Sequence, residues 1–196
     1  MKTSLAQFLP KTAVADAQHL IERYPCDIKI VEDRVTKHGD FRKKANGYQQ
    51  ITINRNLNPY RFLLTLVHEL AHLATFEQHG RVRPHGVEWK RIFQELILPF
   101  LRPDIFPSEV LRLLAKHFKN PKATIDSDIK LSWALKQYDD LNGKNFIFEL
   151  PLETRFIYKN RVFIKGEKRR TRFGCLEEKS GKLYLFHHHA EVEKVG

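Results

Sequence analysis

The chain has 196 residues, of which 42% are hydrophobic and 11% aromatic, so it can bury a core and is not an intrinsically disordered protein. Its formal net charge of +11 favours a polyanionic partner, although a solvated basic surface gives the same total. Two cysteines, Cys26 and Cys175, exclude the disulfide framework of a small secreted protein, and no apolar run reaches the roughly 18 residues of a membrane span. We therefore expect a cytoplasmic protein with no membrane partner, and no pattern reports its oligomeric state.

The first part of the chain predicts one packing helix followed by a small sheet. Residues 12–24 place apolar side chains at helical spacing, and Pro25 ends that run. Residues 26–58 then alternate apolar and polar positions, which predicts two or three antiparallel strands. The turn signals between these strands are His38-Gly39-Asp40 and Asn46-Gly47.

The stretch from Pro59 to His79 predicts a long helix that is apolar around most of its circumference. Asn58 and Pro59 supply a helix cap and a first-turn residue. A helix of this kind must be covered by neighbours on several sides. We therefore expect any site on it to lie deep in a cleft.

This helix contains the pattern H-E-x-x-H as His68, Glu69 and His72. Residues four apart lie on the same helix face, so both imidazoles can bind a single ion, and zinc is the ion that such a pair favours. Glu69 falls about 100° around the helix, where its carboxylate can accept a proton from water. The alternative is a buried helix whose histidines form hydrogen bonds in the core.

Beyond this helix, amphipathic spacing predicts helices over residues 87–101, 108–118 and 126–138. The character changes after residue 140, where short β-rich runs separated by turn residues predict a meander of hairpins or a small barrel. We expect an α+β protein with two domains, a helical domain with a small antiparallel sheet over residues 1–140 and an all-β domain over 141–196. The β-rich runs are residues 145–150, 154–159, 161–166, 171–178 and 182–187.

Basic charge is concentrated in the second predicted domain. Residues 159–172 contain seven basic residues and one acidic residue, interleaved with Phe163 and followed by Phe173. Such a segment could hold phosphates with its basic side chains and stack bases on its aromatic rings. A half-buried strand, with aromatic residues inward and arginines in water, has the same pattern. The candidate nucleic-acid-binding residues are Lys159, Lys165, Lys168, Arg169, Arg170 and Arg172.

A catalytic zinc ion requires a third protein ligand, and the residues downstream of the helix supply several candidates. His79 is unsuitable because it would lie about 10 Å along the helix axis from His72. A glutamate returned by the following helix would fit, which keeps Glu88 and Glu95 as alternatives. We favour His85, because it stands in a loop that can fold back and is followed by Gly86, which allows close backbone approach. Thr75 and Gln78 stand where a metzincin requires glycine and histidine, which excludes that class.

The pattern HELAH, followed by a loop and then HGVEWKRIF, resembles the SprT-like family of zinc metallopeptidases, which includes the Spartan proteases that degrade proteins crosslinked to DNA. The resemblance covers roughly residues 15–100. It implies a zincin-like core, one zinc ion held by His68, His72 and His85, and Glu69 as the catalytic base. Many members end in a cysteine-rich zinc ribbon, which this chain cannot form with Cys175 alone.

The resemblance implies a zinc metalloendopeptidase that cleaves peptide bonds with activated water and acts on DNA-associated or DNA-crosslinked proteins. The expected partners are protein substrates and single-stranded or damaged DNA, with a role in DNA repair and a cytoplasmic, nucleoid-associated location. A nucleic-acid-binding protein with a structural or inactive zinc site is the alternative, because the motif alone does not show that a coordination position is open.

Overall fold

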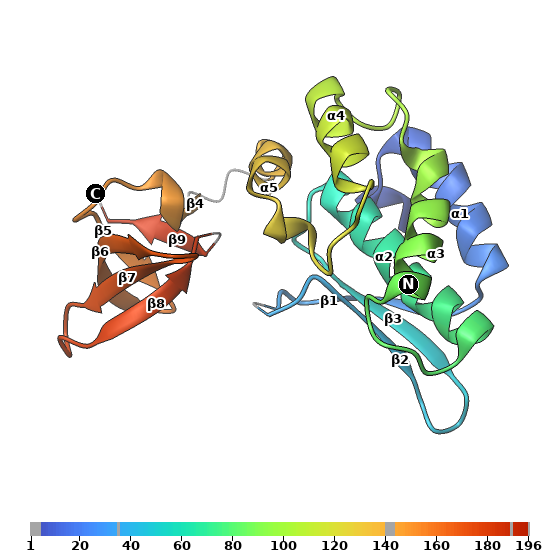
Figure 1. The fold of residues 1–196 in the computed structure, drawn as a ribbon, viewed down its shortest axis with the longest axis horizontal. Coiled ribbons are helices and arrows are strands. Elements are labelled where there is room, and N and C mark those ends of the chain that lie inside the picture. Colours follow the sequence, from blue (N-terminus) through green and yellow to red (C-terminus); the bar gives the residue numbers. More distant parts are fainter. Residues whose placement is uncertain (1–4, 35, 140–143, 189, 196) are drawn as a thin grey trace. The chain divides into compact units, whose positions relative to one another are not determined.

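A computed structural model describes residues 5–34, 36–139, 144–188 and 190–195 of the chain (Figure 1). The chain divides into two compact units, Met1–Asp139 and Asp140–Gly196, and each unit has its own hydrophobic core. The boundary expected between residues 140 and 141 lies outside the described residues. Within the described ranges, no helix has the length and apolar character needed to cross a membrane.

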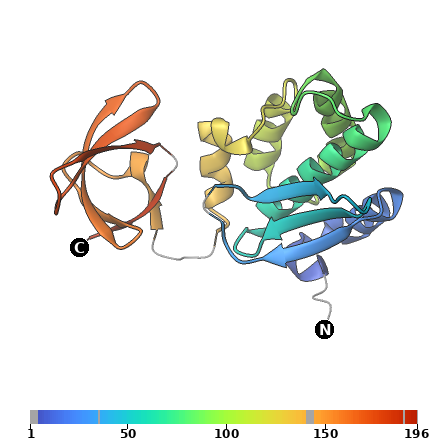
Figure 2. The same ribbon diagram turned by 90° about the horizontal axis from the view of Figure 1, so that it is seen from below.

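The first unit is a mixed α+β structure, and all five expected helices are present in its described residues. The strands lie along one side of the unit, with α3 and α4 on the opposite side (Figure 2). Single-turn 3₁₀ helices extend or connect the longer elements. The elements are η1 (Leu5–Phe8), η2 (Lys11–Ala13), α1 (Val14–Arg23), β1 (Asp27–Val31), β2 (Gly39–Lys43), β3 (Gln49–Asn54), α2 (Pro59–His79), α3 (Val87–Ile97), η3 (Leu98–Phe100), α4 (Ser108–His117), η4 (Ile125–Ser127) and α5 (Ile129–Lys136).

The sheet of this unit is mixed, so the expectation of an antiparallel sheet is wrong. Its strand order is β1-β3-β2, in which β2 is antiparallel to β3 and β1 is parallel to it. The end of β3 is held by hydrogen bonds to the segments of both earlier strands. The N–H of Asn54 donates to the carbonyl of His38, and the N–H of Arg55 donates to the carbonyl of Val31, each at 2.9 Å. Alternating apolar residues determine which face is buried, but they do not determine which strands pair.

The helix α2 is the centre of the first core. It packs against β2 and β3 and also against α3. Asn58 caps its start, because the side-chain oxygen accepts hydrogen bonds from the N–H groups of Tyr60 and Arg61. The helix is buried around most of its circumference, as its apolar pattern predicts. Its fully buried side chains include Phe62, Leu63, Leu64, Leu66, Val67, Leu70 and Leu73.

The second unit is an antiparallel sheet, as expected, with strand order β4-β9-β5-β6-β7-β8. The strands β5 to β8 form the predicted meander of neighbouring hairpins. The last strand, β9, is not predicted, because its sequence EVEK contains only one apolar residue, Val192. The elements are β4 (Lys144–Phe146), η5 (Ile147–Glu149), β5 (Arg155–Tyr158), β6 (Arg161–Arg169), β7 (Arg172–Glu177), β8 (Leu183–His187) and β9 (Glu191–Lys194).

Candidate metal centre

Three imidazole rings converge between α2 and the loop that precedes α3. The Nε2 atom of His72 lies 3.1 Å from that of His68 and 3.0 Å from that of His85, and the remaining pair is 3.3 Å apart. His68 and His72 project from the same face of α2, one turn apart, as their spacing predicts. The structure therefore brings the two motif histidines together with the third ligand candidate from the loop.

His85 reaches the other two rings through a turn with unusual backbone geometry. Its φ angle is 58°, in the left-handed region that residues other than glycine rarely adopt. Strain of this kind persists where the surrounding structure holds it, and it is common at functional sites. The N–H of Gly86 donates to the carbonyl of Arg83 at 3.0 Å and closes the turn. A side chain at Gly86 would not fit, because its Cβ would lie 2.9 Å from that carbonyl oxygen.

The spacing of the three nitrogens fits a shared cation better than a hydrogen-bonded cluster. Each Nε2 atom either carries a proton or offers a lone pair, so in a triangle at least two of the three are alike. At least one contact near 3 Å would then be unfavourable without a cation. Three lone pairs directed at one ion remove this conflict, and ligand nitrogens at 2.0–2.1 Å from a tetrahedral ion lie about 3.3 Å apart. The triad can therefore bind a metal.

The electrostatic surroundings keep these imidazoles neutral, which is the form that binds metals. Burial lowers the pKa of His68 well below its ordinary value, and the neighbouring His72 and His85 lower it further. Burial likewise lowers the pKa of His72 to about 4 and also lowers the pKa of His85. All three side chains are thus without charge at neutral pH in the metal-free protein.

Trp89 packs against every member of the triad. Its ring centroid lies 4.8 Å from that of His68, 5.3 Å from that of His72 and 4.7 Å from that of His85. The indole is 1% exposed, and Phe93, one turn further along α3, packs against both the indole and His68. The sequence places Trp89 next to the motif but does not reveal this role, because an apolar residue on a core-facing helix is expected to be buried.

Glu69 lies against the first residues of β2, not among the three imidazoles. Its side chain is buried, and its carboxylate accepts a hydrogen bond from the N–H of Phe41. Burial raises the pKa of Glu69 to about 8, and the nearby Asp40 raises it further. A Cβ atom at Gly39 would lie 2.6 Å from Oε1 of Glu69. Gly39 was expected as a turn residue, and the structure shows that its missing side chain also allows this close approach.

The other ligand candidates lie away from the triad. Among the described residues, the group of side chains close enough to share an ion contains His68, His72 and His85. His79 and Glu95 are exposed. Glu88 folds back toward its own helix start, since its Oε2 would lie 3.2 Å from a Cβ at Gly86.

The expected basic surface of the second unit is smaller than the sequence suggests. Lys165 is 4% exposed, donates a hydrogen bond to the carbonyl of Leu150 and lies over the ring of Phe173, so it is unavailable to a phosphate. Phe163 and Phe173 are buried, as expected for a half-buried strand with its aromatic residues inward. Their rings are therefore not available for stacking on bases. Lys165 lies two positions from Phe163 on β6, so both side chains share the buried face of the strand, and the polar partner that allows a lysine there comes from a distant segment.

The remaining basic residues fall into two places. Lys159 lies in the β5–β6 turn, at the opposite end of the nine-residue strand β6 from Arg170, a separation of about 30 Å. The other four are exposed and surround the β6–β7 turn. We name this group the basic turn; it consists of Lys168, Arg169, Arg170 and Arg172.

Known proteins resemble the part of the first unit that contains the three histidines. Residues 18–102 match the model of the SprT-like family. The chain is 45% identical over 66 residues to Protein SprT of Vibrio parahaemolyticus, which covers 29% of this chain and 40% of the relative. It is 36% identical over 80 residues to Protein SprT of Vibrio atlanticus, with 40% and 48% coverage, and 33% identical over 110 residues to that of Yersinia pestis, with 52% and 59% coverage.

The chain therefore spans about half the length of the curated relatives it matches. The matched segment contains the three histidines and Glu69 and ends before η4, α5 and the second unit. No solved structure matches the chain significantly.

The triad makes a prediction about metal affinity. Replacing His85 with alanine should weaken the binding of one divalent ion by about 100-fold or more, because two ligands then remain of three. Glu88→Ala, three positions along the chain in the first turn of α3, should change the affinity by less than about threefold. Competition titration with a chromogenic chelator measures both, and the opposite ranking would make Glu88 the third ligand.

Burial of Glu69 makes a prediction about pH. The folded pKa of about 8 lies above the ordinary value of 4.5, so this group's contribution to stability is present below about pH 4.5 and is lost as the pH rises through 8. Metal-free Glu69→Gln should therefore gain roughly 2 to 4 kcal/mol relative to the wild type between pH 5 and pH 9. Urea unfolding with chelator present measures the difference. Glu95→Gln, at an exposed position, is the control, and parallel pH curves for Glu69→Gln and the wild type would contradict the assignment.

Proposed function

The chain belongs to the SprT-like family through residues 18–102, and we propose that it is a zinc-dependent metalloendopeptidase with a zincin-like core. The observation that carries the proposal is the convergence of three neutral imidazole nitrogens, two of them from α2, the helix that also holds the buried Glu69. A metal-free packing role for the histidines would not require their Nε2 atoms to meet near 3 Å.

Zinc is the proposed metal because of the donor set. The ligand candidates are three nitrogens, with neither a thiolate nor a carboxylate among the described residues of the cluster. Three histidines with one position open to water are a known catalytic arrangement for zinc, whereas calcium and magnesium prefer oxygen ligands. When bound, zinc supplies Lewis acidity toward the scissile carbonyl and lowers the pKa of water to about 7.

The protein's own contribution to catalysis is proton transfer by Glu69. Its carboxylate takes a proton from the attacking water and later returns it to the leaving amine. The low-dielectric surroundings that raise its pKa also make the ionised carboxylate a stronger base. Trp89 and Phe93 keep the ligand rings in place, so the metal site does not depend on loop residues alone.

Proteins associated with or crosslinked to DNA are the proposed substrates, with single-stranded or damaged DNA as a partner. Family membership supports this choice, and so does the basic turn, whose four cationic side chains are exposed on one hairpin. The proposal includes a role in DNA repair and a nucleoid-associated, cytoplasmic location. In this scheme the first unit cleaves and the second unit binds nucleic acid.

The decisive variant for catalysis is Glu69→Gln. It should retain one zinc ion per chain, because Glu69 is not among the ligands, and lose at least about 100-fold in turnover, because the base is gone. Cleavage of denatured casein, with and without single-stranded DNA and with chelator as control, measures this. Normal turnover in the variant would remove Glu69 as the base. A zinc-loaded wild type without any cleavage would favour a nucleic-acid-binding protein with a structural metal.

The basic turn is tested by salt-dependent binding. Arg169→Gln/Arg170→Gln should weaken binding of the full chain to a labelled single-stranded oligonucleotide and reduce the slope of log affinity against log salt by about 1.4, since each lost phosphate contact on a single strand contributes about 0.7. The matched control is Lys179→Gln/Lys182→Gln, which removes equal charge from the β7–β8 turn. Equal losses in the two variants would show that only net charge matters.

A further inference from the structure

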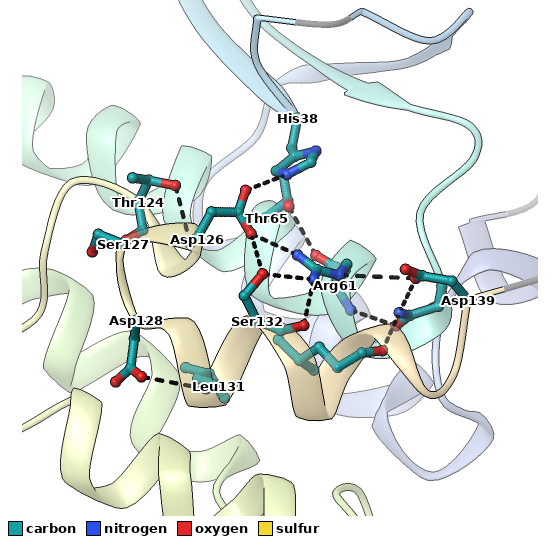
Figure 3. Close-up of polar contacts among 12 residues, drawn as sticks. His38, Arg61, Thr65, Thr124, Asp126, Ser127, Asp128, Leu131, Ser132 and Asp139 are labelled. Atoms are coloured by element: carbon teal, nitrogen blue, oxygen red, sulfur yellow. Dashed lines mark hydrogen bonds and ion pairs between the residues drawn. The ribbon is translucent and has the colours of Figure 1, made fainter. Parts of the chain in front are cut away.

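A polar network at the start of α2 joins three parts of the first unit that are distant in sequence (Figure 3). Its centre is Asp126 in η4. One carboxylate oxygen accepts a hydrogen bond from Arg61 at 2.8 Å and from Ser132 at 3.0 Å. The other lies 2.8 Å from Nε2 of His38, which precedes β2. Asp126 thus connects α2, α5 and the residue that leads into β2.

The part of the network between α2 and α5 has an evident structural role. Arg61 is 8% exposed, and its guanidinium also donates to the carbonyl and the hydroxyl of Ser132. A buried arginine requires such partners, because an unpaired buried charge destabilises a fold by several kcal/mol. Asn58 adds a further link between the two helices by donating to the carbonyl of Leu135 at 2.9 Å. These contacts hold α5 on α2.

The contact between Asp126 and His38 is different, because it is not needed to hold α5 on α2. The His38 side chain is 43% exposed, so it belongs to the surface and not to the core. The residue after it is Gly39, whose backbone lies against Glu69 and against Thr65 of α2. Two residues further on, the N–H of Phe41 donates to the carboxylate of Glu69. The hydrogen bond between His38 and Asp126 therefore holds the segment that contacts Glu69.

We propose that Asp126 and His38 are positioning residues, which clamp the start of β2 against Glu69 and thereby fix the orientation of its carboxylate. Two observations support the clamp. The carbonyl of His38 also accepts a hydrogen bond from Asn54 at 2.9 Å, so the segment is held from both sides. The close approach at Gly39 leaves no space for β2 to shift toward α2. The anchor lies on η4, beyond the residues that match the family.

The clamp rests on the proposed function only where it names Glu69 as the catalytic base. The contacts that hold the start of β2 against Glu69 do not depend on whether the protein is active. Loss of the His38 contact should free the start of β2 while leaving the bonds among Arg61, Asp126 and Ser132 intact. This difference separates a positioning role from general support of the fold.

The test uses the full chain with His38→Ala and measures hydrogen exchange of the Phe41 amide by NMR. The exchange rate should rise at least about tenfold, while the amides in the middle of α2 remain protected and zinc stoichiometry stays at one per chain. His38→Gln, which retains a donor, should restore most of the protection. The matched control Asp16→Asn breaks an ion pair with Arg102 in the same unit and should leave Phe41 unchanged.

Asp126→Asn should raise Phe41 exchange to the same degree and also lower the thermal midpoint, because it affects Arg61 as well. If the chain cleaves casein, His38→Ala should lower kcat about tenfold with KM little changed. Phe41 exchange within twofold of the wild type in His38→Ala would overturn the clamp. An equal rise across all amides of the first unit would overturn it too, because it would show general destabilisation. Inactive wild-type protein would refute the proposed function and leave the exchange result valid.

Discussion

The convergence of three imidazole nitrogens within 3.3 Å is the constraint on which the candidate metal site depends. Two of these nitrogens come from one helix and follow directly from its geometry. The third comes from a loop, and it meets them only because α3 is packed on α2 and Arg83, His85 and Gly86 form a tight turn. Packing between two helices thus determines whether a two-ligand motif becomes a three-ligand site.

Burial has opposite consequences for the two kinds of site residue. For the histidines, low dielectric removes the proton and leaves a lone pair, so burial prepares them for a metal. For Glu69, the same burial favours the protonated form, which is not the form of a base. A nearby cation would lower the pKa of this carboxylate again, because an opposite charge stabilises the ionised form. The protonation of Glu69 therefore depends on whether a cation occupies the site. In the metal-free protein, the protonated form of Glu69 is the one that stabilises the fold.

Most of the secondary structure and the triad could be predicted from the sequence, because helix periodicity and capping are local. The bounds of α2 follow from Asn58 and Gly80, and the motif lies entirely within it. The failures concern relations between distant segments. Parallel pairing of β1 with β3 depends on a chain crossing that alternation does not encode, and β9 is formed by partners on both sides despite a polar sequence. Lys165 can be buried because its ammonium group donates a hydrogen bond to the carbonyl of Leu150 and lies over the ring of Phe173.

The network around Asp126 shows why a motif alone is an incomplete description of such a site. Residues 18–102 contain the histidines and Glu69, yet the segment that contacts Glu69 is anchored by a residue outside that range. Nothing local in the sequence around Asp126 indicates this, because Arg61 and His38, the partners that link it to α2 and to the start of β2, are 65 and 88 positions away in the chain. The motif specifies which groups perform the chemistry. The orientation of those groups depends on contacts that only the folded chain creates. His38 matters to the site because Gly39 and Phe41, which follow it in the chain, contact Glu69.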